Sequence, residues 1–321
     1  MDRSETVPAP PAVVVAVLSY CRPDFLRRLL PLLRDQLVEL KRGTEHHRAE
    51  ILVVDNDPDA GVRTLARDWA VHGVRYVHEP HPGIAAARNR ALDTTRDGLL
   101  VFIDDDEIPE NGWLLALVAA WRRWDCAAVT GPARVEFPHG TDPWVLACGA
   151  LDQPVRPNGT VVASAATNNL LLDVARIHGL DLRFDEHFGL LGGEDTVFGH
   201  TLTRRGATIR WCTEAVVIDP IRTERATRGW MLRRSYRAGT TWSQLQLRVD
   251  AHGLPRTGRT WHTRLELLVR GLVRMARGSG RALHGVLVRQ VGATATGGIA
   301  IASGAGMVLG AVGVTVREYG R

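Results

Sequence analysis

Short apolar runs alternate with amphipathic segments along the first two thirds of the chain. The run AVVVAVL, residues 12 to 18, is rich in β-branched side chains and is typical of a buried strand. Leucines recur at helical spacing in the segment that follows, FLRRLLPLLRDQLVEL, so we expect a helix there. The same order repeats downstream. It predicts an α/β fold with a mostly parallel central sheet flanked by helices.

The later segments extend this order. We expect strands in EILVVDND, VRYVHEP and GLLVFIDDD, and helices in VRTLARDWAVHG, GIAAARNRALDTT and WLLALVAAWRR. Beyond them, CAAVTGPARVEF and ATIRWCTEAVVID are each expected to form one strand, while the proline- and glycine-rich stretch from His139 to Thr160 is expected to be an insertion or flap. Several strands end in aspartates. Because the carboxyl ends of parallel strands border one crevice, we expect those aspartates to meet there.

Three parts of the chain follow from these patterns. Residues 1–11 are polar and proline-rich, and predict a disordered tail without a signal peptide, hence a cytoplasmic location. Residues 12–224 hold the α/β domain, and residues 225–321 predict a helical C-terminal region that associates with a membrane. Residues 290 to 316 carry no charged side chain and are long enough to span a bilayer, although seven glycines lower their hydrophobicity. A packed glycine- and alanine-rich helical hairpin is the alternative.

The amino-acid composition argues against a nucleic-acid-binding protein, a zinc protein and a disulfide-stabilised protein. The formal net charge is +5, yet Lys41 is the only lysine and no nucleic-acid-binding motif accompanies the arginines, so we expect no nucleic-acid partner. The four cysteines are scattered without a CxxC pair, which argues against a zinc site or a disulfide framework. The histidines show no HExxH spacing and are not expected to bind zinc.

In the stretch VFIDDDEIPENGW, residues 101 to 113, an expected apolar strand is followed directly by three consecutive aspartates. Strand side chains alternate in direction, so Asp104 and Asp106 are expected to share a face. Each charge raises the cost of ionising the next, and a divalent cation among them would offset that cost. A solvated acidic turn is the alternative.

Five motifs in order give a more specific resemblance. The sequence is similar to glycosyltransferase family 2, the inverting enzymes of the GT-A fold, from Val13 to Arg237, and most resembles the bacterial branch that builds cell-surface polysaccharides and glycolipids. The motifs that carry the resemblance are SYCRPDFLRRLL, VVDND, PGIAAARNRAL, FIDDDEIPENGW and GGEDTVFGHTLTRRG.

The resemblance implies a set of residues that contact the nucleotide and donor sugar. For some of them the residues themselves leave another interpretation open: Asp24 as a helix N-cap, Arg88 as a solvated helix residue and Asn89 as a loop brace. Asn168 and Asn169 line the donor pocket by the resemblance, or lie in a turn. The donor set comprises Ser19, Tyr20, Arg22, Asp24, Asp55, Arg88, Asn89, Asp104 and Asp105.

Asp104 and Asp106 match the outer positions of the family's DxD motif. This implies that Asp106 contacts Mn²⁺ or Mg²⁺, that Asp104 lies nearer the ribose or donor sugar, and that the cation offsets charge on the departing nucleoside diphosphate. Asp105, on the opposite face, either contacts the donor or folds back into the loop. Asp219 occupies a place where the family often has His or Glu, and is a candidate further metal ligand.

The resemblance also implies the catalytic group. Asp195 in GGEDTVFGHTL is expected to act as the general base on the acceptor hydroxyl, and Glu194 to position the acceptor. Stabilisation of the helix start by both acids is the alternative. In WMLRRSYRAG, either Arg233 or Arg234 would lie beside the diphosphate, or the segment forms a basic membrane-facing helix.

Together these inferences predict a metal-dependent inverting glycosyltransferase. It would move a sugar from a nucleoside diphosphate donor, UDP before GDP or dTDP, to a hydroxyl of a glycan or lipid-linked acceptor, at the inner face of the plasma membrane. A catalytically inactive membrane-associated scaffold is the non-enzymatic alternative. A DxD phosphatase would need a lysine downstream of the aspartates, and Lys41 lies upstream. A nucleotidyltransferase would need an early glycine-rich loop, which is missing from the sequence.

Overall fold

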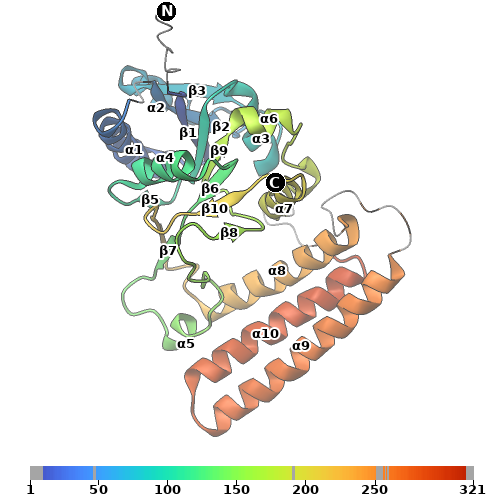
Figure 1. The fold of residues 1–321 in the computed structure, drawn as a ribbon. Coiled ribbons are helices and arrows are strands. Elements are labelled where there is room, and N and C mark those ends of the chain that lie inside the picture. Colours follow the sequence, from blue (N-terminus) through green and yellow to red (C-terminus); the bar gives the residue numbers. More distant parts are fainter. Residues whose placement is uncertain are drawn as a thin grey trace, which may run out of the picture.

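A computed structural model describes residues 10–45, 48–189, 192–250, 256, 258 and 260–315. Its centre is an eight-stranded sheet in the order β3-β2-β1-β4-β9-β6-β10-β8 (Figure 1). The first four strands in that order run parallel, and β9 pairs with β4 and β6 in the antiparallel sense. The predicted disordered tail lies outside the described residues except for Pro10 and Pro11.

The strands of the main sheet are short and mostly buried. Their bounds are β1 Val13–Ser19, β2 Ala49–Asp55, β3 Val74–His78, β4 Leu99–Asp104, β6 Ala128–Thr130, β8 Val161–Val162, β9 Asn169–Asp173 and β10 Ile209–Trp211. A second sheet of three strands, β5-β11-β7, consists of β5 Ile108–Pro109, β7 Ala133–Glu136 and β11 Val217–Pro220.

Helices cover both faces of the main sheet because β1 alternates its side chains between two cores. Val13, Val15 and Val17 face the core that α1 and α4 close, whereas Val14 and Ala16 face the core on the side of α3, α6 and α7. The helices of this part are α1 Pro23–Gly43, α2 Arg63–Asp68, α3 Ile84–Thr94, α4 Trp113–Trp124, α5 Pro143–Leu146, α6 Val174–Gly179 and α7 Glu194–Arg204, with 3₁₀ turns η1 Ala70–His72 and η2 Glu186–Phe188.

Two predicted strands are each divided in the structure. CAAVTGPARVEF forms β6 and β7, and ATIRWCTEAVVID forms β10 and β11, so each expected strand contributes to both sheets. Gly131 marks the division of the first, because a Cβ there would overlap the carbonyl oxygen of Ala215. The prediction of one continuous strand was therefore wrong in both places, since apolar periodicity does not record where a chain changes sheets.

Three long helices end the described chain: α8 Arg228–Arg248, α9 Trp261–Leu287 and α10 Val291–Ala311. Figure 1 shows α10 between α8 and α9, with α9 on the outer side. Glycines allow this close packing. A Cβ at Gly306 would overlap the carbonyl of Tyr236 in α8, and one at Gly278 in α9 would lie 2.8 Å from the Gly297 carbonyl of α10.

The apolar run at the C-terminal end becomes α10. Among the described residues, α10 is the helix whose length and composition would allow it to cross a membrane, with a mean hydropathy of 1.3 over its most apolar window and 33% of that window buried. The interpretation as a packed glycine- and alanine-rich helix matches its contacts with α8 and α9. The mixed α/β class with a C-terminal helical extension is confirmed.

Candidate active site

The register of the parallel strands brings the predicted site residues to one edge of the sheet. Ser19 pairs with Asp55 across β1 and β2, and Leu18 pairs with Asp104 across β1 and β4. Residues at the ends of three strands therefore lie side by side, as the sequence predicted. The Ser19 hydroxyl is buried at this edge and has no hydrogen-bond partner among the described residues.

Four aspartates from distant parts of the chain interact electrostatically. Burial raises the pKa of Asp104 to about 6; Arg88 opposes this shift, while the charges of Asp106, Asp219 and Asp195 add to it. Burial, followed by repulsion from Asp106, also raises the pKa of Asp219. The DDD loop, β11 and the start of α7 thus converge on one acidic cluster, defined here as Asp104, Asp106, Asp195 and Asp219.

Arg22, in the loop after β1, holds the other carboxylates of the DDD loop. Its Nη1 donates to Asp105 Oδ1 at 3.2 Å and to Asp106 Oδ2 at 3.4 Å. Asp105 is 6% exposed, and burial raises its pKa to about 7 although Arg22 opposes the shift. Asp105 therefore pairs with Arg22 of the loop after β1 and does not merely fold back into its own loop, while its contact with the donor stays a prediction. Arg225 also approaches Asp106 Oδ2, with its Nη1 at 3.7 Å.

A buried ion pair links α3 to α7. Arg88 donates a hydrogen bond to Glu194, and the guanidinium lies 5.6 Å from the centre of the Phe184 ring. Both side chains are buried, so the interpretation of Arg88 as a solvated helix residue is wrong. Burial raises the pKa of Glu194 to about 7 against the opposing effect of Arg88. The second Glu194 oxygen, Oε2, is buried and lacks a partner in the described residues.

Two glycines set the start of α7 and the position of Asp195. Gly192 and Gly193 have positive φ angles of 81° and 95°, conformations that favour glycine. The side chain of Asp195 is half-buried, and its Oδ1 accepts hydrogen bonds from the backbone N–H and the hydroxyl of Thr196. Asp195 therefore supports the helix start, as its alternative interpretation expects, and also belongs to the acidic cluster; its role as general base stays a prediction.

Glu107 is a site residue that the sequence analysis missed. Its Oε2 accepts from the backbone N–H of Asp104 at 3.3 Å, and its Oε1 accepts from Asn168 at 2.5 Å. Burial, with repulsion from Asp104, raises its pKa well above the ordinary value. Its place directly after the three aspartates was the available signal. Through Glu107, Asn168 braces the DDD loop.

Several predicted donor-binding residues make internal contacts. Asp55 is fully buried and accepts from Tyr76 Oη at 3.0 Å and from the Val62 N–H at 3.2 Å. Asn89 braces the loop at Phe184, with both of its hydrogen bonds to that backbone at 2.9 Å. Asn169 is buried and accepts from Trp113 Nε1 at 2.9 Å.

Other predicted residues lie at the surface of this region. Tyr20 is half-buried in the loop after β1. Asp24 lies in the first turn of α1, is exposed and pairs with Arg27 at 2.6 Å, while Arg22 occupies the N-cap position. The N-cap interpretation of Asp24 was therefore wrong by two residues, because Pro23 begins the helix. Arg233 is exposed, and Arg234 stacks on Trp230 at 5.4 Å and interacts with Asp219.

The acidic cluster suits a cation that takes part of its shell from a substrate. Among the described residues, no group of three or more His, Cys, Asp or Glu side chains is arranged to hold a metal ion by itself. Mg²⁺ and Mn²⁺ sites of phosphate-transferring enzymes commonly use one or two carboxylates with water and phosphate oxygens. Burial is the main cause of the raised pKa of Asp104, and repulsion from Asp106, Asp219 and Asp195 adds to it; a bound cation would relieve that repulsion. Asp104 and Asp106 therefore fit a metal bound together with a diphosphate.

Comparison with known proteins finds a matching family model and two related bacterial proteins. Residues 14–158 match the model for glycosyl transferase family 2. The succinoglycan biosynthesis protein ExoM of Rhizobium meliloti is 33% identical over 245 residues, covering 75% of this chain and 76% of ExoM. The pre-mycofactocin glycosyltransferase of Mycobacterium tuberculosis is 29% identical over 201 residues, which are 59% of this chain but 41% of that longer protein.

A solved structure supports the architecture. The mannosyltransferase PcManGT from Pyrobaculum calidifontis, solved in complex with GDP-Man and Mn²⁺, superposes with a TM-score of 0.53 over 73% of this chain and 64% of its own. The sequence identity is 19%. At that identity the likeness concerns the fold, which is GT-A.

Proposed function

The chain belongs to glycosyltransferase family 2, and from this premise we propose that it transfers a sugar, with inversion, from a nucleoside diphosphate donor to a hydroxyl of a glycan or lipid-linked acceptor. The observation that carries the proposal is the convergence of Asp104, Asp106, Asp195 and Asp219. Asp104 and Asp106 share one motif, while Asp195 and Asp219 come from two other segments, and a merely solvated acidic turn would not gather carboxylates from three distant parts of the chain.

In this proposal Asp104 and Asp106 hold Mn²⁺ or Mg²⁺, which when bound offsets the charge that develops on the departing diphosphate. Arg225 is 3.7 Å from Asp106 and is therefore close enough to contact a phosphate at the same place. The charge of Arg234 acts on Asp219 of the same cluster. Ser19, at the end of β1 beside Asp55, borders the nucleotide. The donor is a UDP-sugar, with GDP and dTDP as the alternatives.

Asp195 is the proposed general base. Inverting transfer requires one carboxylate to accept the proton of the acceptor hydroxyl as that oxygen attacks the anomeric carbon. Glu194 is held by Arg88, so it positions the start of α7 and, through that helix, the acceptor side of the site. Asp55 and Asn89 act by holding the loops of the donor side.

The organisation of the chain belongs to the same proposal. Residues 12–224 form the catalytic domain, and residues 225–321 keep the enzyme at the cytoplasmic face of the plasma membrane, where a lipid-linked acceptor would be presented. ExoM, the relative at 33% identity, is named for succinoglycan biosynthesis. This supports a role in building a cell-surface polysaccharide.

A donor-hydrolysis and transfer assay tests the proposal. The purified protein is incubated with UDP-glucose, UDP-galactose, GDP-mannose and dTDP-glucose, each with Mn²⁺ and with EDTA, and nucleotide release is measured. Release from one donor that requires the metal supports the proposal. Tight nucleotide binding without release from any donor, with membranes supplied as a source of acceptor, would favour the inactive scaffold instead.

A further inference from the structure

The outer helix α9 presents two different exposed faces. One face is apolar and consists of side chains separated by three, four or eleven positions, each close to a whole number of helical turns; the exposed fractions of Leu265, Leu272 and Leu283 are 54%, 56% and 61%. Glycines of α9 pack against α10 at Gly271, Gly278 and Gly285. The apolar side chains are therefore not the ones that hold α9 in the fold. The apolar edge is defined here as Leu265, Val269, Leu272, Leu283 and Leu287.

A row of arginines lies on the flank of α9 between this edge and the face that packs against α10, and Val269 of the edge lines the same groove as these arginines. Arg270, Arg274, Arg277 and Arg281 recur at helical spacing along α9, and the helix carries only one acidic residue, Glu266. Glu266 pairs with Arg270 at 2.6 Å. In the part of the chain that the structure describes, no acidic side chain pairs with Arg274, Arg277 or Arg281. The row therefore keeps at least three uncompensated positive charges.

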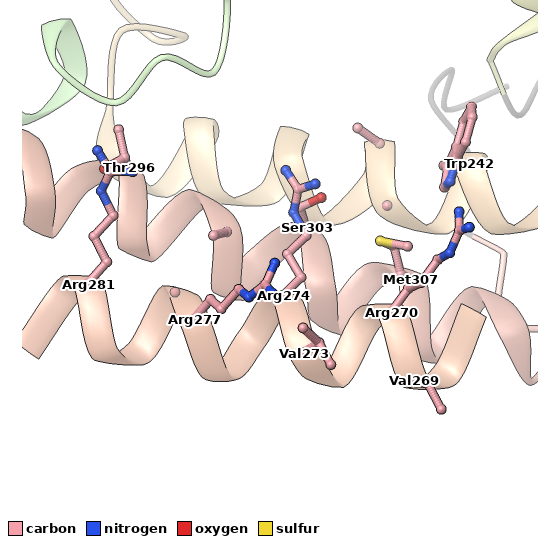
Figure 2. Close-up of a pocket in the computed structure, with 14 residues that line it drawn as sticks. Trp242, Val269, Arg270, Val273, Arg274, Arg277, Arg281, Thr296, Ser303 and Met307 are labelled. Carbon is pink, nitrogen blue, oxygen red and sulfur yellow. The ribbon is translucent and has the colours of Figure 1, made fainter. Parts of the chain in front are cut away.

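The arginine row forms one wall of a groove. Figure 2 shows arginines of α9 reaching over α10 toward α8, with Thr296 and Ser303 of α10 beneath them. Trp242 of α8 closes one end of the groove, whose volume is about 700 Å³. Guanidinium groups above hydroxyl groups match the chemistry of phosphate esters, and a groove of this size has room for lipid headgroups.

We propose that the apolar edge of α9 and the adjoining arginine row dock this protein on the surface of an anionic lipid bilayer. Leucines would enter the boundary between headgroups and acyl chains, while the arginines contact lipid phosphates in the groove. α9 lies on the outer side of the three-helix layer, so the bilayer meets it without displacing α8 or α10 (Figure 1). The docking helix lies in the membrane plane and does not span the bilayer.

Charge favours a bilayer over a second copy of the chain. Two copies joined through this face would bring two arginine rows together, and each row offers Glu266 alone as a counter-charge. An anionic bilayer supplies the missing negative charge. The inference rests on the proposed membrane location and not on the transfer reaction.

Vesicle flotation of the full chain tests this docking, without donor or acceptor, so that its failure is separate from a failure of the proposed reaction. The vesicles are phosphatidylcholine alone or phosphatidylcholine with phosphatidylglycerol in equal parts. We expect binding to the anionic vesicles only. Arg274→Gln with Arg277→Gln should weaken that binding roughly 30-fold, since each arginine near an anionic surface contributes on the order of 1 kcal/mol.

Matched variants make the result decisive. Arg122→Gln with Arg123→Gln removes the same charge from the exposed end of α4 and should leave vesicle binding within about twofold of wild type. Leu272→Ser should weaken it about tenfold, because an apolar contact with lipid is lost. Equal loss in both arginine pairs would overturn the proposal, as would no preference for anionic vesicles. Self-association that Leu272→Ser abolishes, without vesicle binding, would show that the face joins two copies and would also overturn it.

Discussion

Arg88 donates a hydrogen bond to Glu194 across 106 positions of sequence, and this pair joins the helix that follows β3 to the helix that begins with the acidic motif. Both side chains are buried. The charge of Arg88 also lowers the pKa of Asp104, opposing the effect of burial. One arginine therefore connects the donor-side loops with the start of α7 and balances part of the charge of the acidic cluster.

The first prediction concerns the stability of this pair. At pH 8, Arg88→Met should reduce the free energy of unfolding by about 3–5 kcal/mol, because it leaves the ionised Glu194 buried without a counter-charge. Arg88→Met with Glu194→Leu should recover most of that loss, since both buried charges are then removed. Urea denaturation of the wild type, the two single variants and the double variant measures the coupling. Additive effects of the two single changes would contradict the role given to the pair.

The second prediction concerns pH. The folded-state pKa of Glu194 is raised from 4.5 to about 7, so the folded protein keeps a proton that the unfolded chain releases between those values. We compare the free energy of unfolding of the wild type with that of Glu194→Gln. The difference favours the wild type most below about pH 4.5. It shrinks by on the order of 3 kcal/mol as the pH rises to about 7. Thermal unfolding of both proteins at pH 5 and pH 8 checks the sign; a difference that grows in favour of wild type at pH 8 would refute it.

The third prediction separates catalysis from binding. Asp195→Asn should reduce transfer by a factor of about 10²–10⁴, because it removes the proposed proton acceptor, yet leave nucleotide affinity nearly unchanged. Initial rates and a nucleotide titration measure the two effects. Asp93→Asn, at an exposed ion pair with Arg183, is the matched control and should keep wild-type rates. An equal loss of nucleotide binding in the Asp195 variant would place this residue in the donor site.

The fourth prediction compares two helical glycines. Gly306→Ala should destabilise the protein by about 1–3 kcal/mol, because the new methyl group would overlap the Tyr236 carbonyl. Gly280→Ala meets no atom within 4 Å and should stabilise α9 by up to about 1 kcal/mol through helix propensity alone. Chemical denaturation of both variants tests whether α10 is packed between its neighbours. Similar effects at the two positions would show that it is not.

Much of the main sheet could be predicted because its strands are short apolar runs that end in acids. β1, β2 and β4 match the expected segments, and their register places Ser19, Asp55 and Asp104 at one edge. Apolar side chains recur every second residue in a half-buried strand and every three to four residues in a helix. These spacings therefore show which segments form strands or helices and which of their side chains face the core. The family was predicted from the five motifs that resemble glycosyltransferase family 2. The pattern of apolar and polar residues alone would not have identified it.

The remaining details depend on contacts between distant residues. Nothing local in the sequence shows that Arg22 pairs with Asp105, that Glu107 faces Asn168 or that Arg88 is buried against Glu194. The change of sheet at Gly131 depends on the carbonyl of Ala215, more than eighty residues away. Such contacts are set by the tertiary packing, and a single sequence contains no signal for them.

The most direct test of the account is a calorimetric titration with UDP, GDP and dTDP, each with Mn²⁺ and again with EDTA, for wild type, Asp106→Ala and the surface control Asp35→Ala. We predict that one nucleotide binds wild type and the control only with the metal. The Asp106 variant should bind it at least about tenfold more weakly, because a charged contact is lost. Metal-independent binding, or equal affinity of wild type and the Asp106 variant, would contradict the assignment of the acidic cluster as the donor-metal site.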